Sequence, residues 1–109
     1  MKRFCLALDL KNDPVLIGEY KRHHEKIWPE ITDHIYEAGV LDMEIYHVGD
    51  RLFMIMETED DFTFEKMDAL AANNKKVEDW ESLMWKFQKP LEGVESGEKW
   101  KLMERIFKL

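Results

Sequence analysis

The sequence predicts an α+β domain with the ferredoxin-like βαββαβ order, in which a four-stranded antiparallel sheet carries helices on one face. Short apolar segments alternate with longer segments of helical period, and a Gly-Asp turn at positions 49–50 joins two of the short segments into a hairpin. A chain of 109 residues, 45% of them hydrophobic, is sized for one domain, residues 1–109, around a single core.

The first strand is expected at residues 3–10 (RFCLALDL), a short apolar run that a cluster of breakers follows. Asn12 or Asp13 is suited to cap a helix, and Pro14 fits its first turn. The helical period then runs through positions 16, 20, 24, 27, 28, 31, 35 and 38 and stops at Gly39. Pro29 lacks an amide hydrogen, so this helix should end or kink between residues 25 and 28 and restart at Pro29.

The segments 40–48 (VLDMEIYHV) and 51–59 (RLFMIMETE) read as the two strands of the hairpin. Large side chains occupy successive positions in both strands, which predicts that both faces of the sheet are covered. Helices can cover only one face in this topology, so we expect a homodimer in which the other sheet face packs against a second copy, as a dimeric α/β barrel.

The second half of the chain predicts helices at 60–74 and 75–90, a loop at 91–100 and a closing strand at 99–107. The helix at 75–90 carries Val77, Trp80, Met84 and Phe87 on one stripe. No repeat or low-complexity tract interrupts the pattern.

Charge and composition exclude several classes of partner. The net charge of −7 disfavours nucleic acid, because the chain offers no basic stripe that would release counterions from a phosphate backbone. Cys5 has no second cysteine to pair with and reads as a small buried hydrophobe. No apolar stretch approaches the roughly 18 residues that cross a bilayer, so we expect no membrane partner and a cytoplasmic location.

The candidate site lies on the first helix. Tyr20 and His24 are four residues apart and share a face, so both can point at one small molecule between the helix and the sheet. Trp80 should reach the same cleft from the last helix, and Met43 with Met54 or Met56 should supply its floor. Imidazole titrates near neutrality, which suits proton transfer.

Each of these residues also has a structural interpretation. Tyr20, His24 and Trp80 can all be core residues on apolar stripes, and His23, about 100° around the helix, is expected to be solvated. His24 and His47 with Glu44 or Glu57 are not spaced as a zinc signature, so we predict no metal. The sequence has no dinucleotide fingerprint, phosphate-binding glycine loop or nucleophilic triad, so chemistry at this site should need no cofactor.

The sequence resembles the L-rhamnose mutarotase family over nearly its whole length. The fairly specific string Y-x-x-x-H-x-x-I-W-P-E occurs at residues 20–30, and the further matching positions are Gly39, Ile45-Tyr46, Trp80 and Glu104-Arg105-Ile106-Phe107. The resemblance implies a dimeric ferredoxin-like enzyme without a cofactor, an aldose 1-epimerase that interconverts the α and β anomers of a 6-deoxy-L-sugar. It also implies that His24 is the proton donor and that Tyr20 contacts the sugar.

The resemblance further implies that Trp80, the first position of a tryptophan pair, lines the sugar site; Trp28 can add apolar surface for the sugar. Two positions depart from the family pattern: Met43 stands where a sugar-contacting tyrosine is usual, and Glu81 where the second tryptophan is expected. Both substitutions should change which sugar hydroxyls are recognised. The segment 97–107 (GEKWKLMERIF) resembles a subgroup associated with L-fucose, which favours L-fucose over L-rhamnose while both stay candidates.

Two other functions fit the same fold. A dimeric ferredoxin-like monooxygenase would need a haem or another cofactor, and no His or Cys stands in an evident axial-ligand context. A non-catalytic sugar-binding domain would use the same cleft without proton transfer.

Overall fold

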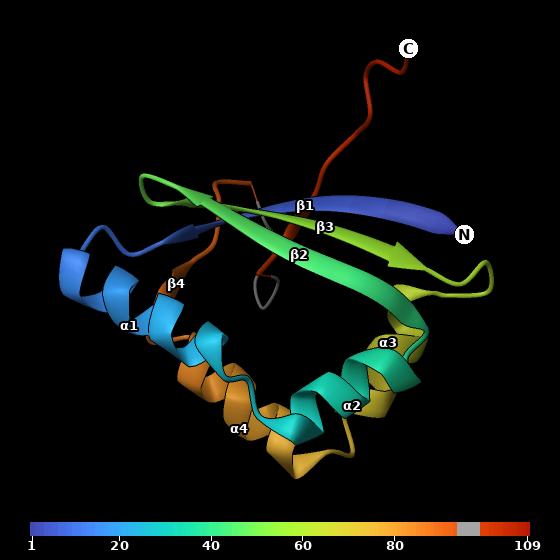
Figure 1. The fold of residues 1–109 in the computed structure, drawn as a ribbon, viewed down its shortest axis with the longest axis horizontal. Coiled ribbons are helices and arrows are strands. Elements are labelled where there is room, and N and C mark those ends of the chain that lie inside the picture. Colours follow the sequence, from blue (N-terminus) through green and yellow to red (C-terminus); the bar gives the residue numbers. More distant parts are fainter. Residues whose placement is uncertain (94–98) are drawn as a thin grey trace.

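The computed structural model describes residues 1–93 and 99–109. An antiparallel sheet carries four helices on one side, as Figure 1 shows, which confirms the predicted α+β layering. The strands are β1 (Lys2–Leu10), β2 (Val40–Val48), β3 (Arg51–Thr58), β4 (Gln88–Lys89) and β5 (Lys101–Leu102). The helices are α1 (Pro14–Glu25), α2 (Pro29–Glu37), α3 (Phe64–Ala71) and α4 (Lys75–Met84). Residues 94–98 of the predicted loop lie outside the described residues.

The sheet has the order β2-β3-β1-β4, with β5 also paired to β1. β1 and β3 run antiparallel from the pair Lys2–Thr58 to the pair Asp9–Arg51. Side chains alternate between faces along a strand, and the burial of Leu52, Met54 and Met56 marks the face that the helices cover. The sheet order and the antiparallel pairing are those of the predicted ferredoxin-like topology.

The first helical region breaks where the sequence predicts. The Asp13 carboxylate caps α1 by accepting hydrogen bonds from the amides of Val15 (2.9 Å) and Leu16 (3.3 Å). α1 ends at Glu25, and α2 restarts at Pro29, whose missing amide hydrogen costs nothing in a first turn. Gly39 follows α2 with φ +97°, a left-handed conformation that glycine adopts without strain.

The second helical region begins later and ends earlier than predicted. α3 starts at Phe64 rather than at residue 60, because residues 59–62 form a turn and Thr63 is the residue that caps the helix. α4 starts after Asn74, which accepts hydrogen bonds from the amides of Lys76 (3.1 Å) and Val77 (3.3 Å). α4 ends at Met84 instead of near residue 90, because the backbone beyond it leaves the helix to pair with β1.

The closing strand is the largest difference from the prediction. Within the predicted strand 99–107, only Lys101–Leu102 pairs with β1. The next segment along the same edge of β1 is β4, whose two residues were predicted to lie at the end of a helix. The fourth strand position is therefore divided between two short segments. Residues 103–109 extend away from the sheet on the side opposite the helices (Figure 1), and Ile106 is 90% exposed.

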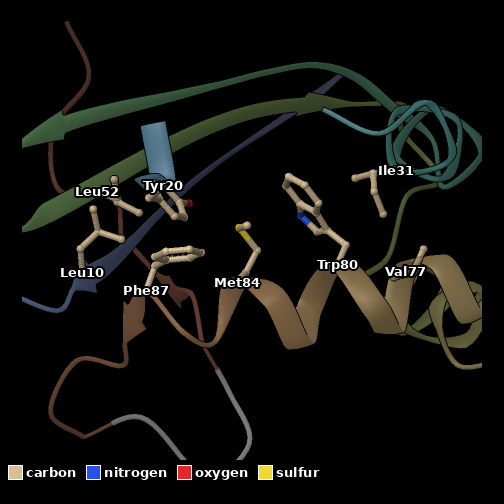
Figure 2. Close-up of a cluster of buried hydrophobic side chains, with 8 residues drawn as sticks. All are labelled: Leu10, Tyr20, Ile31, Leu52, Val77, Trp80, Met84 and Phe87. Carbon is tan, nitrogen blue, oxygen red and sulfur yellow. The ribbon is translucent and has the colours of Figure 1, made fainter. Parts of the chain in front are cut away.

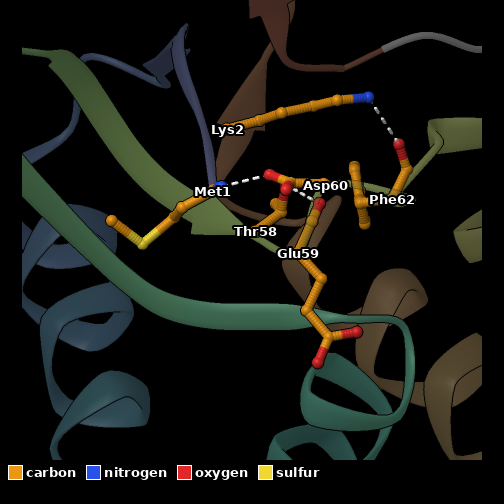
Figure 3. A network of polar contacts seen from close by, with 6 residues as sticks. All are labelled: Met1, Lys2, Thr58, Glu59, Asp60 and Phe62. Atoms are coloured by element: carbon orange, nitrogen blue, oxygen red, sulfur yellow. Dashed lines mark hydrogen bonds and ion pairs between the residues drawn. The ribbon is translucent and has the colours of Figure 1, made fainter.

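The start of β1 is tied to the turn that follows β3 (Figure 3). The amino-terminal ammonium of Met1 pairs with Asp60, and Lys2 Nζ donates to the carbonyl of Phe62 at 3.4 Å. The Thr58 hydroxyl donates to the carbonyl of Glu59 at 3.0 Å. The amino-terminal ammonium group therefore engages one carboxylate of the acidic run at 57–61, that of Asp60.

The core lies between the sheet and the helices and has two clusters. The larger cluster, drawn in Figure 2, joins α1, α2 and α4 to the sheet through Leu10, Tyr20, Ile31, Leu52, Val77, Trp80, Met84 and Phe87. Figure 2 shows Met84 and Trp80 rising from α4 toward the sheet. Tyr20 and Trp80 belong to this cluster, so the candidate site is built into the edge of the main core.

Within the described ranges, no helix is both long and apolar enough to span a bilayer.

Candidate active site

Tyr20 and His24 lie one above the other on the last two turns of α1. Their ring centroids are 4.3 Å apart, as the four-residue spacing predicts. Tyr20 belongs to the core and is 3% exposed, whereas His24 is half-buried at the helix end that the break before Pro29 creates. The sequence therefore brings the two predicted catalytic side chains together at one end of a helix.

One ring nitrogen of His24 is already engaged by the backbone. Nδ1 lies 2.9 Å from the carbonyl oxygen of Tyr20. A carbonyl oxygen only accepts, so Nδ1 carries a hydrogen, and in the neutral imidazole Nε2 holds the free lone pair. The contact fixes both the tautomer and the orientation of the ring, and it leaves Nε2 as the nitrogen that can take up a proton.

Burial shifts the pKa values of His24 and Tyr20 in opposite directions. It lowers the pKa of His24 below the ordinary value of 6.5; the carbonyl of Tyr20 opposes this effect, and the neighbouring His23 adds to it. Burial raises the pKa of Tyr20 to about 12, opposed by the hydrogen bond from Gln88 and assisted by the negative charge of Glu81. At neutral pH the imidazole is therefore mostly neutral and the phenol protonated.

Two tryptophans from different elements extend the aromatic cluster. The centroid of Trp80, on α4, lies 5.6 Å from that of His24, with an interplanar angle of 66°. Trp28 caps the start of α2 and packs edge-to-face on Trp80 at 5.2 Å. Trp80 lines the cavity described below, whereas Trp28 is not among its lining residues. Trp28 therefore acts on the site through its contact with Trp80.

A cavity of about 810 Å³ opens between the sheet and the helices beside these rings. Its size lies within the range of about 300–1,000 Å³ that is usual for small-molecule sites. The sheet supplies Met43, Ile45, Met54 and Met56, and the helices supply Tyr20, His24 and Trp80. A smaller cavity of about 200 Å³ also reaches Tyr20 and His24, but it contains neither tryptophan. The larger cavity therefore joins Tyr20, His24 and Trp80, with Met43 in its wall.

Glu81 also lines the larger cavity, next to Trp80 along α4. Its carboxylate lies 2.6 Å from Lys99 Nζ, which also donates to the Glu81 carbonyl at 3.2 Å. The same ammonium group stands over the ring of Trp85, 4.5 Å from its centroid. The side chain of Lys99 is 10% exposed and that of Glu81 52% exposed, so about half of the Glu81 side chain stays accessible beside the ion pair. The pair attaches the segment before β5 to α4.

Among the polar residues that line this cavity, sequence reasoning missed two buried ones, Gln88 and His34. Gln88 stood within a predicted helix, and the two-residue strand β4 is too short to show a period of its own. His34 could have been found, because it lies three residues after Ile31 and four before Ala38 on the apolar stripe of the second helical segment.

The structure corrects the expectation that His23 is solvated. Its ring is half-buried, 5.5 Å from that of Phe87 and 6.5 Å from that of Trp80, because the turn after α4 folds back beneath α1. Across residues 1–93 and 99–109, no three His, Cys, Asp or Glu side chains gather closely enough to hold a metal ion.

Comparison with known proteins gives a consistent result over the whole chain. A family model described as L-rhamnose mutarotase matches residues 3–109. A protein named L-fucose mutarotase from Xanthomonas campestris is 41% identical over 111 residues, an alignment that covers 100% of this chain and 89% of that protein.

Solved structures share the fold. A crystal structure of L-rhamnose mutarotase from Formosa agariphila superposes with a TM-score of 0.74 at 20% identity, over 100% of this chain and 99% of the other. Tetracenomycin F2 cyclase from Streptomyces glaucescens, a type-II polyketide cyclase, superposes with a TM-score of 0.60 at 16% identity, over 100% and 97% of the two chains. Because identity is low in both cases, these two likenesses concern the fold alone.

Proposed function

Because this chain belongs to the L-rhamnose mutarotase family, we propose that it is an aldose 1-epimerase, an isomerase that interconverts the α and β anomers of a 6-deoxy-L-sugar. The observation that carries the proposal is the cluster of Tyr20, His24 and Trp80 beside a cavity large enough for a monosaccharide. Such a cavity combines apolar walls with a few polar groups, which suits a ligand that has an apolar face and hydroxyl edges.

In this proposal His24 moves the proton that opens and recloses the ring. The anomeric hydroxyl and the ring oxygen are bonded to the same carbon, so both lie within reach of one nitrogen. Neutral Nε2 takes the proton of the anomeric hydroxyl and donates it to the ring oxygen as the ring carbon–oxygen bond breaks. The aldehyde then turns, and the reverse transfers close the ring on its other face. The imidazole is neutral before and after, so protons balance.

Tyr20 and the aromatic wall hold the sugar during this exchange. The phenol, protonated at neutral pH, contacts a sugar oxygen, while Trp80, backed by Trp28, offers apolar surface to the carbon–hydrogen face and the C6 methyl group. A well-placed acid or base contributes about 10²–10⁴-fold, which suffices for a reaction that also proceeds unaided in water.

L-fucose is the sugar we favour over L-rhamnose. The relative with 41% identity is named L-fucose mutarotase, and its alignment spans the whole chain. The half-exposed side chain of Glu81, which lines the cavity, supports a site that hydrogen-bonds a sugar hydroxyl where other family members carry an indole.

A homodimer through the outer sheet face is part of the proposal. The register places Tyr46, Phe53 and Ala7 side by side on the face opposite the helices, next to the row Glu44, Ile55 and Cys5. Two ion pairs flank this apolar centre, Arg3 with Glu57 at 3.5 Å and Arg51 with Asp9 at 2.7 Å. An apolar centre with a charged border is the composition of a two-fold interface.

The cytoplasmic location expected from the sequence stays a prediction.

Saturation-transfer NMR on L-fucose and L-rhamnose tests the activity directly, since it measures the exchange of anomers at equilibrium. We expect the wild type to accelerate exchange and His24→Ala to lose roughly 10²–10⁴-fold of that acceleration. Arg22→Ala, a change at an exposed residue of the same helix, is the control and should keep most of it.

The outcome also separates the rival functions. Equal rates for the wild type and His24→Ala would remove His24 from the mechanism. Binding of either sugar without accelerated exchange would favour the sugar-binding domain instead. A shift of the Soret band on adding haem would favour the monooxygenase.

A further inference from the structure

Gln88 brings a polar atom without a partner into the interior. The residue begins β4, is 4% exposed and lines the larger cavity. Its Nε2 lies 3.5 Å from the hydroxyl oxygen of Tyr20, whereas its Oε1 has no hydrogen-bond partner among the described residues. A buried polar atom without a partner opposes folding, so a residue of this kind needs an explanation.

The amide of Gln88 can meet the phenol in two ways. With Nε2 toward the phenol, the amide donates one of its two hydrogens to the hydroxyl oxygen, and Oε1 goes unpaired among the described residues. With the amide turned over, Oε1 would accept the phenol hydrogen and an NH₂ group with two hydrogens would go unpaired. The structure has the donating orientation, in which the hydroxyl oxygen of Tyr20 accepts from the amide of Gln88.

This orientation decides what the phenol can do. Its oxygen is occupied as an acceptor, and no acceptor for its hydrogen is found in residues 1–93 and 99–109. Tyr20 lines the cavity, so the hydrogen is available to a ligand there. We propose that Gln88 is a positioning residue that directs the hydroxyl hydrogen of Tyr20 into the cavity, toward an oxygen atom of the bound sugar.

The assignment rests on the proposed function and completes its polar contacts. Nε2 of His24 offers a lone pair, and the phenol positioned by Gln88 offers a hydrogen. One turn of α1 thus presents an acceptor and a donor to the sugar before it arrives, which reduces the reorganisation that binding requires.

Two substitutions of similar size test the assignment. Gln88→Met removes both polar atoms and frees the phenol to turn. Gln88→Glu places an acceptor beside the phenol, which draws the hydrogen away from the cavity. We expect Gln88→Met to slow anomer exchange by roughly two- to tenfold, and Gln88→Glu to slow it more. Lys89→Met, the same replacement at the adjacent exposed residue, should leave the rate unchanged.

A double-mutant cycle with Tyr20→Phe separates positioning from packing. If Gln88 acts through the phenol, Gln88→Met has no further effect on exchange or on the dissociation constant of L-fucose in the Tyr20→Phe protein. An equal loss in both backgrounds would show a packing role and overturn the inference. If Gln88→Glu does not fold, the cycle with Gln88→Met carries the test alone.

A measurement without sugar keeps the inference distinct from the proposed function. In protein labelled at the tyrosine Cζ carbons, we expect Gln88→Met to move the resonance of Tyr20 and to leave those of Tyr36 and Tyr46 in place. An unmoved Tyr20 resonance would overturn the positioning role. A wild type that does not accelerate exchange would instead defeat the proposed activity, and the resonance would then decide the role of Gln88 alone.

Discussion

His24, in the last turn of α1, combines a fixed tautomer with a lowered pKa. The carbonyl of Tyr20 occupies Nδ1, and burial disfavours the imidazolium. A residue in the middle of an exposed helix face would keep its ordinary pKa and would rotate freely. Burial therefore sets the protonation state of the proposed catalytic group, and the backbone contact sets its orientation.

The pH dependence of the rate follows from this pKa. The proposed step needs neutral imidazole, and because the pKa of His24 lies below 6.5, the neutral form persists as the pH falls through that value. We expect the kcat/KM for anomer exchange, after subtraction of the buffer rate, to be flat near neutrality and to fall only below about pH 6.5. A rate that rises as the pH falls through this range would mean that the resting imidazole is a proton donor.

Glu81 gives a second test at the scale of a single residue. If its carboxylate accepts a hydrogen bond from a sugar hydroxyl, Glu81→Gln should raise the KM for L-fucose by about three- to tenfold, a modest effect because the group is half-exposed. Glu78→Gln, an exposed change on the same helix, is the control. An unchanged KM for Glu81→Gln would exclude the carboxylate from sugar recognition.

Among the elements, α4 depends on one capping residue. Asn74 accepts hydrogen bonds from two amides at the start of this helix, which carries Trp80 and Glu81 to the cavity. We expect Asn74→Ala to lower the free energy of unfolding by about 0.5–2 kcal/mol and the Tm by several degrees in a thermal melt. Asn73→Ala, one residue earlier and exposed, should change neither value. A melt in which both variants behave alike would contradict the cap.

The elements that the sequence predicted well are those with a strong local signal. Pro29 and Asp13 fix helix boundaries through the backbone itself, and the hairpin of β2 and β3 has its turn at Gly49. The site residues on α1 were predictable for the same reason, because helical spacing alone brings Tyr20 and His24 together.

The elements that the sequence predicted poorly depend on contacts between residues that are far apart in the sequence. Phe87 follows the helical period of α4, yet its carbonyl accepts a hydrogen bond from the amide of Lys11 at 2.8 Å, and Gln88 then joins the sheet. At these residues, pairing with the open edge of β1 stabilises the chain more than continuing the helix would. No local sequence pattern reveals that this edge is open. The ion pair of Glu81 with Lys99 depends on the same long-range pairing.

For the molecule as a whole, the proposed dimer is tested by its state of association. Tyr46 is 54% exposed on the outer sheet face, and Tyr36 is 64% exposed on the helical layer. We expect the wild type to sediment as a dimer and Tyr46→Lys to shift it toward the monomer, because a charge at an apolar interface is costly to bury. Tyr36→Lys should sediment like the wild type. A monomeric wild type would contradict the proposed interface.

The divided fourth strand has a consequence for how such a domain can diversify. β4 and β5 dock on neighbouring stretches of β1, so the chain leaves this edge of the sheet after Lys89 and returns to it at Lys101. Lys99 and Trp100, which line the cavity, stand directly before β5 rather than on the helices. Substitutions at these two positions can therefore exchange cavity-lining groups over evolutionary time while the imidazole and the phenol stay in place.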